Sequence, residues 1–349
     1  MRNKRWMSVL LAFAIILLVA SFYTLPFYVQ KPGSAFSLDE IVEVEGSSHS
    51  QGEFSLMTVS QVQANAFAYI WAKFDNYQSI YPVDQVRNPH ESEQEYSLRQ
   101  SYLMDDSSSQ AIEVAFTKAD ADFSYTYRGV YVLNVYPDMP AEDLLNAGDR
   151  ITAIDDLKFE SSEEFIEYVA QKKEGDKVKI TIERDEETYN EVLSLQAFPD
   201  IPSQIGLGIS LVDDRIVNTD PKVSIDSDGI GGPSAGLMYS LEIYDQLIEE
   251  DLTKGYNIAG TGTITSEGEV GRIGGIEQKV VAADRQGIEI FFAPDDKISS
   301  NILEQNPDIK TNYEEADATA KNIKSSMKVI PVKTFEDALN YLDSLDEKS

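Results

Sequence analysis

Residues 7–29 form a run of 23 amino acids that contains no charged side chain. As an α-helix this run would extend about 34 Å, which is enough to cross the roughly 30 Å of hydrocarbon in a bilayer. Three basic residues lie within residues 1–6, and the first acidic residue, Asp39, follows the run. The positive-inside rule then places residues 1–6 in the cytoplasm and the chain beyond the run outside the cell. The sequence therefore predicts a single-pass protein of the cell membrane, with a transmembrane helix over residues 7–29.

A cleaved signal peptide is the competing interpretation of the same run. Its apolar core would be unusually long, and only a weak small-residue cleavage site occurs, near Ala20 and Ser21. We therefore expect an uncleaved anchor with the membrane as a partner. Whether the anchor is removed later is left open.

The balance of charge and the scarcity of certain residues limit the partners and the chemistry. The 349 residues include 29 Lys and Arg against 60 Asp and Glu, a net charge of −31. Because this charge repels a phosphate backbone, nucleic acid is not expected as a partner. The chain has no cysteine and only two histidines, which excludes disulfides and a thiol nucleophile and disfavours a histidine-rich metal site. We expect neither a metal nor a cofactor.

The remaining chain is long and apolar enough for two or three domains. Changes in pattern divide it into three parts, residues 30–123, 124–200 and 203–345. In the first part, extracytoplasmic on this prediction, a strand is expected around residues 41–44 and helices over residues 60–75 and 106–118. The fold class predicted is α+β, in several domains.

Short strands and turns dominate residues 124–200. Apolar and polar residues alternate from Val130 to Val135 and from Lys177 to Glu183, as in half-buried strands. A single helix is expected from Ser162 to Gln171. This order of elements indicates a small, partly open β-barrel.

The same stretch resembles a bacterial PDZ domain. The resemblance is carried by Arg128-Gly129-Val130-Tyr131-Val132, by Pro140-Ala141 and by Gly148-Asp149-Arg150. PDZ domains bind an extended peptide as an added edge strand and hold its terminal carboxylate on loop amides. The peptide-binding positions that the resemblance implies are Tyr127, Arg128, Gly129 and Val130. Whether such a module binds C-termini or gates another site is left open, and Gly129 could alternatively serve only to make a turn.

The search for a nucleophile begins by elimination. A conventional serine triad needs a histidine as its base. The two histidines, His49 and His90, lie in polar segments that contain no recognisable buried site and no candidate nucleophile. A Ser-His mechanism is therefore not expected.

A serine on a sharp turn into a helix occurs in Gly231-Gly232-Pro233-Ser234-Ala235-Gly236. Pro233 suits the first position of a helix, and the apolar residues from Leu237 to Leu247 support a buried helix after it. The amides and the positive dipole end of that helix could stabilise an oxyanion beside Ser234. Without a nearby base, the same pattern is equally that of a Gly-rich turn that only caps a helix.

A base is suggested by the helix predicted for residues 276–286. On its surface Lys279 shares an apolar face of about 100° with Ile276, Val280 and Ala283. Burial that lowers the pKa of Lys279 by about three units costs roughly 4 kcal/mol and leaves an amine that can accept a proton near neutral pH. The alternative is a lysine that extends from the edge of the apolar face into solvent.

Together the two segments resemble the proteolytic domain of Lon-type serine peptidases, over about residues 205–344. The matching positions are Gly232-Pro233-Ser234-Ala235-Gly236, Thr261-Gly262-Thr263-Ile264, Gly268-Glu269-Val270, and Gly274-Gly275-Ile276 followed by Lys279. The resemblance implies an α+β fold and a catalytic dyad of Ser234 and Lys279. It also implies supporting roles for Thr261, through a hydrogen bond, and for Gly232, Pro233 and Ala235 in the turn.

Two features depart from the pattern of this family. Gly231 stands where many Lon enzymes have an acidic residue, which leaves substrate alignment in doubt. No G-x-x-x-x-G-K-[ST] loop occurs in the sequence, so ATP is not expected as a partner.

The combination of anchor, PDZ-like module and Lon-like domain resembles a group of surface peptidases of Gram-positive bacteria. It predicts an ATP-independent serine endopeptidase that cleaves exported peptides or proteins at the cell surface, with the PDZ module for substrate recognition or gating. The alternative is a catalytically silent, membrane-anchored scaffold that binds peptides. The substrate, the cleavage preference and the oligomeric state are left open by the sequence.

Overall fold

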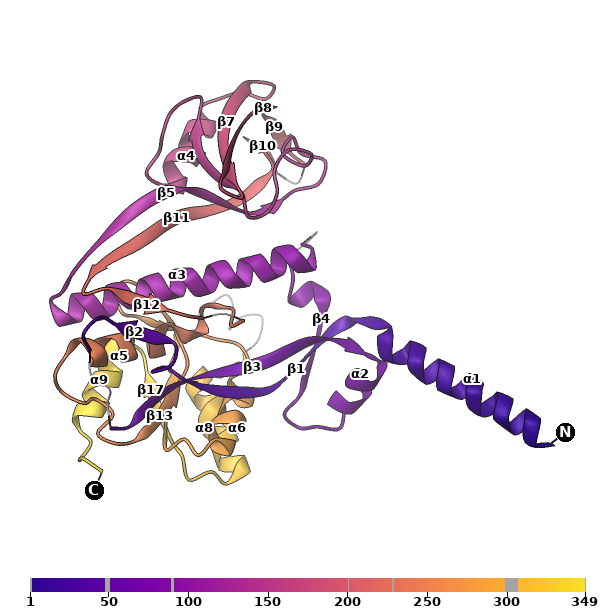
Figure 1. The fold of residues 1–349 in the computed structure, drawn as a ribbon, viewed down its shortest axis with the longest axis vertical. Helices are drawn as coiled ribbons and strands as arrows, with labels where there is room; N and C mark the ends of the chain where they lie inside the picture. The colour runs from indigo at the N-terminus through magenta and orange to yellow at the C-terminus, as the bar shows by residue number, and fades with distance from the viewer. Residues whose placement is uncertain are drawn as a thin grey trace.

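A computed structural model describes the chain over residues 2–47, 51–88, 91–199, 201–227, 229–298 and 307–348. A β-rich module stands on one side of the long helix α3 (Glu93–Ala119), and a mixed α/β body lies on the other side of this helix (Figure 1). Helix α1 (Arg2–Phe22) projects away from the body.

The expectation of a transmembrane helix over residues 7–29 is wrong. Within the described ranges, no helix is long and apolar enough to cross a membrane. The uncharged run is divided between two elements, because α1 starts among the basic residues and ends at Phe22, and residues 24–29 belong to strand β1 (Thr24–Ser37). The predicted single-pass localisation, with the rest of the chain outside the cell, depended on this helix and is wrong as well. The membrane as a partner stays a prediction.

A six-stranded sheet forms the centre of the body, in the order β17-β16-β13-β3-β1-β4. The strands besides β1 are β3 (Glu53–Asn65), β4 (Ser79–Pro82), β13 (Asn257–Gly260), β16 (Ile290–Pro294) and β17 (Lys328–Val332). β3, β13, β16 and β17 run parallel, and β1 is antiparallel to both β3 and β4. Strands from the two halves of the sequence thus lie side by side.

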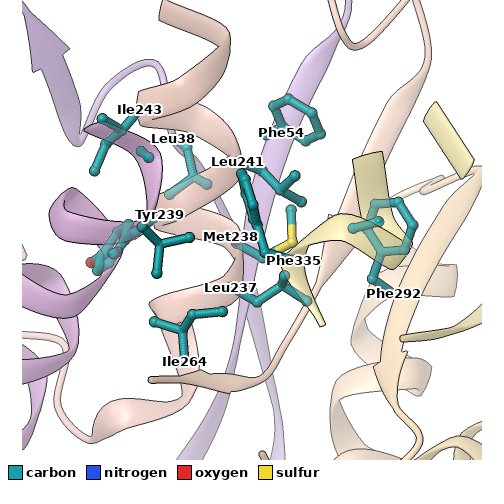
Figure 2. Packing of buried hydrophobic residues seen from close by; sticks show 14 of the residues in the cluster. Leu38, Phe54, Leu237, Met238, Tyr239, Leu241, Ile243, Ile264, Phe292 and Phe335 are labelled. Atoms are coloured by element: carbon teal, nitrogen blue, oxygen red, sulfur yellow. The ribbon is translucent and has the colours of Figure 1, made fainter. Parts of the chain in front are cut away.

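Helices cover both faces of this sheet. They are α5 (Gly236–Leu247), α6 (Ile276–Arg285), α8 (Asn312–Ile323) and α9 (Phe335–Asp343), together with α3. Phe292 of β16 packs into one core with α3, α5 and α9, and its neighbour Phe291 packs into a second core with α6 and α8. Successive strand residues point to opposite faces, so a sheet buried on both sides needs apolar residues at every position. Figure 2 shows the first core, where Leu237 and Met238 of α5 lie beside Phe292.

Residues 30–123, which the sequence suggested as a separate part, contribute to this same body. Phe54 of β3 and Met104 of α3 lie in the core that α5 occupies. The helix predicted over residues 60–75 is confined to α2 (Ala66–Ala72), because the residues before it form β3. The helix predicted over residues 106–118 lies inside α3.

The β-rich module contains a five-stranded sheet in the order β11-β5-β6-β7-β8. Its strands are β5 (Asp122–Val135), β6 (Arg150–Ile154), β7 (Lys177–Arg184), β8 (Glu187–Ser194) and β11 (Ile209–Asp220). Helix α4 (Ser162–Ala170) and the short strands β9 (Gln196–Phe198) and β10 (Ile201–Gly206) complete it. Phe165 and Val169 of α4 pack with the strands into a core of the module's own.

The module is an insertion in the body. β5 follows α3, β11 leads back to strand β12 (Val223–Ile225), and β12 pairs with β2 (Val42–Val44). β5 and β11 pair along their whole length, from Asp122 opposite Asp220 to Val135 opposite Ile209. The sequence analysis assigned residues 203–220 to the third domain, whereas β10 and β11 belong to the inserted module.

A packing prediction follows from Gly236, where α5 meets α3 and strand β14 (Thr263–Ile264). An added Cβ at this position would lie 2.7 Å from both Ser107 Oγ and Ile264 Cγ2. We expect Gly236→Ala to lower the free energy of unfolding by about 1–3 kcal/mol, because overpacking forces side chains or backbone to move. Urea denaturation measures this loss. Gly274→Ala is the control, since its Cβ meets no atom within 4 Å, and an equal loss in both variants would contradict the packing explanation.

Candidate active site

Ser234 lies in the turn that leads into α5. A 3-10 turn spans Pro233–Ala235, and Gly232 precedes it with a φ of 89°, a conformation that favours glycine. The N–H of Gly232 donates to the carbonyl of Gln100 at 2.9 Å, and Ser107 Oγ donates to the carbonyl of Pro233 at 3.0 Å. Helix α3 therefore fixes the backbone immediately before Ser234.

Lys279 extends from α6 toward this serine. Gly275, in the left-handed conformation with a φ of 70°, precedes the helix. The Lys279 side chain lies on the buried face of α6, and the residue is only 2% exposed. Its Nζ lies 2.8 Å from Ser234 Oγ and 2.8 Å from Thr261 Oγ1. The structure thus has the buried lysine of the first alternative, and not the solvent-exposed one.

Thr261 connects the two residues to the central sheet. It follows β13 directly, and its Oγ1 donates to the carbonyl of Ser234 at 3.0 Å. The N–H of Gly262 donates to the same carbonyl at 3.0 Å. One threonine hydroxyl therefore contacts both the backbone of Ser234 and the amine of Lys279.

Burial changes the acid–base behaviour of Lys279. The pKa of this amine falls from 10.5 to about 7, because the ammonium loses its hydration inside the body. A large fraction of folded molecules then carries an uncharged amine at neutral pH. Such an amine can accept a proton from Ser234 Oγ across the hydrogen bond between them.

A cleft of about 660 Å³ opens beside Ser234. Its walls come from the turn around Ser234, α3, β1 and β3. They include the apolar side chains of Phe36, Leu56, Met57 and Met104 together with the side-chain amides of Gln30, Gln61 and Gln100. Apolar side chains and amides of this kind match the alternation of side chains and peptide groups in an extended polypeptide.

The contributions of α3 were missed by the sequence analysis. Ser107 and Pro233, for example, are 126 positions apart in the chain, so no local spacing links them. The only signal was the helical spacing of apolar residues between 106 and 118, which showed that the segment packs on something without indicating its partner.

The four predicted peptide-binding residues lie on β5, and none of them lines the cleft beside Ser234. Tyr127 packs against the core of the module, Arg128 forms an ion pair with Asp214, and Val130 is fully buried. Gly129 has a φ of 142° in the middle of the strand. Three of these residues therefore make contacts within the module itself, and the fourth, Gly129, has a backbone conformation that favours glycine.

The two histidines set aside in the sequence analysis, His49 and His90, lie outside the described residues. In the part of the chain that the structure describes, no group of three or more His, Cys, Asp or Glu side chains could hold a metal ion.

Two family models match separate stretches of the chain. Residues 220–343 match the C-terminal proteolytic domain of Lon protease (S16), and residues 111–194 match the PDZ domain. Both family resemblances predicted from the sequence motifs are thereby confirmed. The chain therefore contains a stretch similar to PDZ domains and a proteolytic domain similar to that of Lon protease, which supports a serine peptidase.

Curated relatives and solved structures are similar to parts of the chain. The Lon protease of Mesomycoplasma hyopneumoniae is 30% identical over 122 residues, and that of Fusobacterium nucleatum is 33% identical over 106 residues. These alignments cover 35% and 30% of this chain, but only 12% of each relative. The crystal structure of the PDZ domain of an SdrC-like protein from Listeria monocytogenes is 46% identical, with a TM-score of 0.24, and the match covers 25% of this chain and 90% of that one.

The buried amine leads to a stability prediction. Between pH 10.5 and about 7 the unfolded chain binds a proton at Lys279 and the folded chain does not, so the stability of the wild type rises with pH in this window. We expect Lys279→Met to be more stable than the wild type at neutral pH by about 1–4 kcal/mol and to lose this pH dependence. Urea denaturation over the same window measures both effects.

Lys333→Met is the matched control for this comparison, because the Lys333 side chain is 61% exposed. It should leave the pH dependence of the wild type unchanged. A Lys279→Met protein that is less stable than the wild type, with the pH dependence retained, would contradict burial as the cause of the pKa shift.

Proposed function

We propose that this protein is an ATP-independent serine endopeptidase in which Ser234 is the nucleophile and Lys279 the general base. The observation that carries the proposal is the contact of 2.8 Å between Ser234 Oγ and the Nζ of a lysine whose pKa burial lowers to about 7. A serine hydroxyl is a weak nucleophile until a neighbouring base removes its proton. The uncharged Lys279 amine lies within hydrogen-bond distance of that hydroxyl.

The reaction proceeds in two stages. As Ser234 Oγ attacks the carbonyl carbon of a peptide bond, its proton passes to Lys279 Nζ, and the resulting ammonium protonates the leaving amine. Water then attacks the carbonyl carbon of the acyl-enzyme and its proton passes to Lys279 Nζ, and the acid product leaves as Ser234 Oγ takes that proton from the ammonium. Because burial disfavours the ammonium, the lysine gives this proton up readily at each stage.

Thr261 and the turn around Ser234 orient the reacting groups. The contacts of Thr261 with the Ser234 carbonyl and with Lys279 Nζ limit the rotation of both partners. We assign it a positioning role. The turn Pro233–Ala235 supplies backbone N–H groups at the start of a helix, where they can stabilise the oxyanion of the tetrahedral intermediate.

The substrate on this proposal is an extended stretch of polypeptide. It lies in the cleft with an apolar side chain among Phe36, Leu56 and Met104, close to Ser234. The chain has no nucleotide-binding loop of the G-x-x-x-x-G-K-[ST] type. Hydrolysis therefore proceeds without ATP, on segments that are already unfolded or flexible.

The nucleophile assignment predicts that Ser234→Ala abolishes cleavage. We expect kcat for a fluorogenic peptide to fall by at least about 10³-fold, because the acyl-enzyme can no longer form. An acylating serine probe should label the wild type and not this variant. Ser266→Ala, which removes an exposed hydroxyl in a hairpin, is the control and should react like the wild type. A wild-type protein that neither cleaves peptides nor reacts with the probe would favour the silent scaffold.

The base assignment predicts the pH profile. Below pH 7 the Lys279 amine is protonated and cannot accept a proton, so kcat/KM should rise about tenfold for each pH unit and level off above a pH of about 7. Lys279→Arg should be inactive at every pH, because a guanidinium stays charged. Initial rates on a fluorogenic peptide measure both. A flat profile across this range, in protein shown by circular dichroism to be folded, would exclude Lys279 as the base.

A further inference from the structure

The strand β5 of the PDZ domain has partners on both of its edges. PDZ domains bind an extended peptide by adding it as a strand to a sheet edge, and the positions predicted for such binding, residues 127–130, lie on β5. One edge of β5 pairs with β6, through Val130 opposite Ile151. The other edge pairs with β11 (Figure 1). The edge that a peptide would need is therefore occupied by the chain's own strand.

The segment that occupies this edge packs into the module as a bound peptide would. Ile209 and Leu211 pack against the core of the module, and Leu207, just before β11, is only 3% exposed. Asp213, on the same face of the strand as Ile209 and Leu211, accepts a hydrogen bond of 2.6 Å from the N–H of Ser162 at the start of α4. β11 is thus held between β5 and α4 by apolar contacts and by a helix N-terminus.

An acidic side chain of β11 also lies against the arginine in the middle of β5. Asp214 lies opposite Gly129 in the strand pairing. Its carboxylate, 8% exposed, forms ion pairs with Arg128 and Arg150. In this antiparallel pairing Asp214 therefore meets β5 at residues 128–129, which are among the positions that the resemblance implied for binding a peptide and its terminal carboxylate.

We propose that residues 207–214 are an internal ligand of the PDZ domain. The groove between β5 and α4 holds this segment of the same chain and does not bind substrate. The substrate reaches the cleft at Ser234 without first binding to the PDZ domain. This inference concerns the binding surface of the PDZ domain and stands apart from the proposed catalytic function.

Tethering makes the internal ligand hard to displace. A segment joined to its site by short linkers has an effective concentration on the order of 1 mM. A free peptide of the same sequence would therefore displace half of it only at about that concentration. Ordinary micromolar substrates would leave the groove filled.

The first experiment measures binding of a fluorescein-labelled peptide with the sequence of residues 205–214 to the full chain. Every version of the protein in this experiment carries Ser234→Ala, so that the peptide stays intact. We expect no saturable change in anisotropy up to about 100 µM protein. Adding Leu211→Ala weakens the internal copy and should raise the affinity for the labelled peptide by about tenfold or more. Val192→Ala, on the exposed face of β8 at 59% exposure, is the control and should change nothing.

Saturable binding of the labelled peptide at low micromolar concentration, without Leu211→Ala, would overturn the proposal. So would a folded Leu211→Ala protein whose affinity for the peptide is unchanged. Because neither result depends on cleavage, this experiment decides the inference even if the proposed peptidase mechanism fails.

The second experiment locks β11 in place and remains informative if Leu211→Ala does not fold. Tyr131 and Val212 are directly opposite in the pairing of β5 and β11, and the chain contains no cysteine. In Tyr131→Cys/Val212→Cys we expect equal kcat/KM for a long unfolded substrate in the oxidised and the reduced form, within about twofold. A tenfold loss on oxidation that a reductant restores would show that the groove must open for substrate, and would contradict the proposal.

Discussion

The uncharged amine of Lys279 inside the body is the constraint on which the rest of the structure depends. Holding it there costs on the order of 4 kcal/mol at neutral pH, for a pKa near 7 in place of 10.5. The two-sided helical packing of the central sheet must offset this cost by burying large apolar side chains such as Phe291 and Phe292. Two hydroxyls, those of Ser234 and Thr261, provide the polar contacts of the amine. The same burial that destabilises the fold makes the lysine a usable base.

Helix α3 links this site to the inserted PDZ domain. On one side it contacts the turn around Ser234, through Gln100 and Ser107. On the other side the hydroxyl of Tyr102 donates to the carbonyl of Asp213 at 3.0 Å, and its ring stacks on Tyr131 with a centroid distance of 6.0 Å. The antiparallel pair of strands β5 and β11 thus packs against the helix that supports Ser234. A PDZ domain whose groove holds a segment of its own chain still has a structural role, because it packs against α3 and supports it.

The sequence predicted the parts of the site whose signals are local. The glycines and proline around Ser234 and the position of Lys279 on an apolar helical face each reflect the geometry of a single turn or helix. Signals that depend on distant partners were misjudged. Residues 24–29 read as the end of a helix, but they pair in part with β3 and β4, and residues 60–65, which show helical spacing, pair with β1. Pairing between strands that are distant in the sequence overrides a weak local preference for helix. Such pairing leaves no signal in a short window of a single sequence.

The insertion sets an order of events while the protein is being synthesised. The ribosome makes β1, β3 and α3 first, then the whole inserted domain, and only afterwards the segments with Ser234 and Lys279. Domains fold as units during synthesis, and the inserted domain has a core of its own, so it can fold while half of the host sheet is missing. Until α6 packs on β1 and β3, the lysine remains hydrated and charged. The contact between Ser234 and an uncharged Lys279 therefore forms only after the last of these segments has been synthesised.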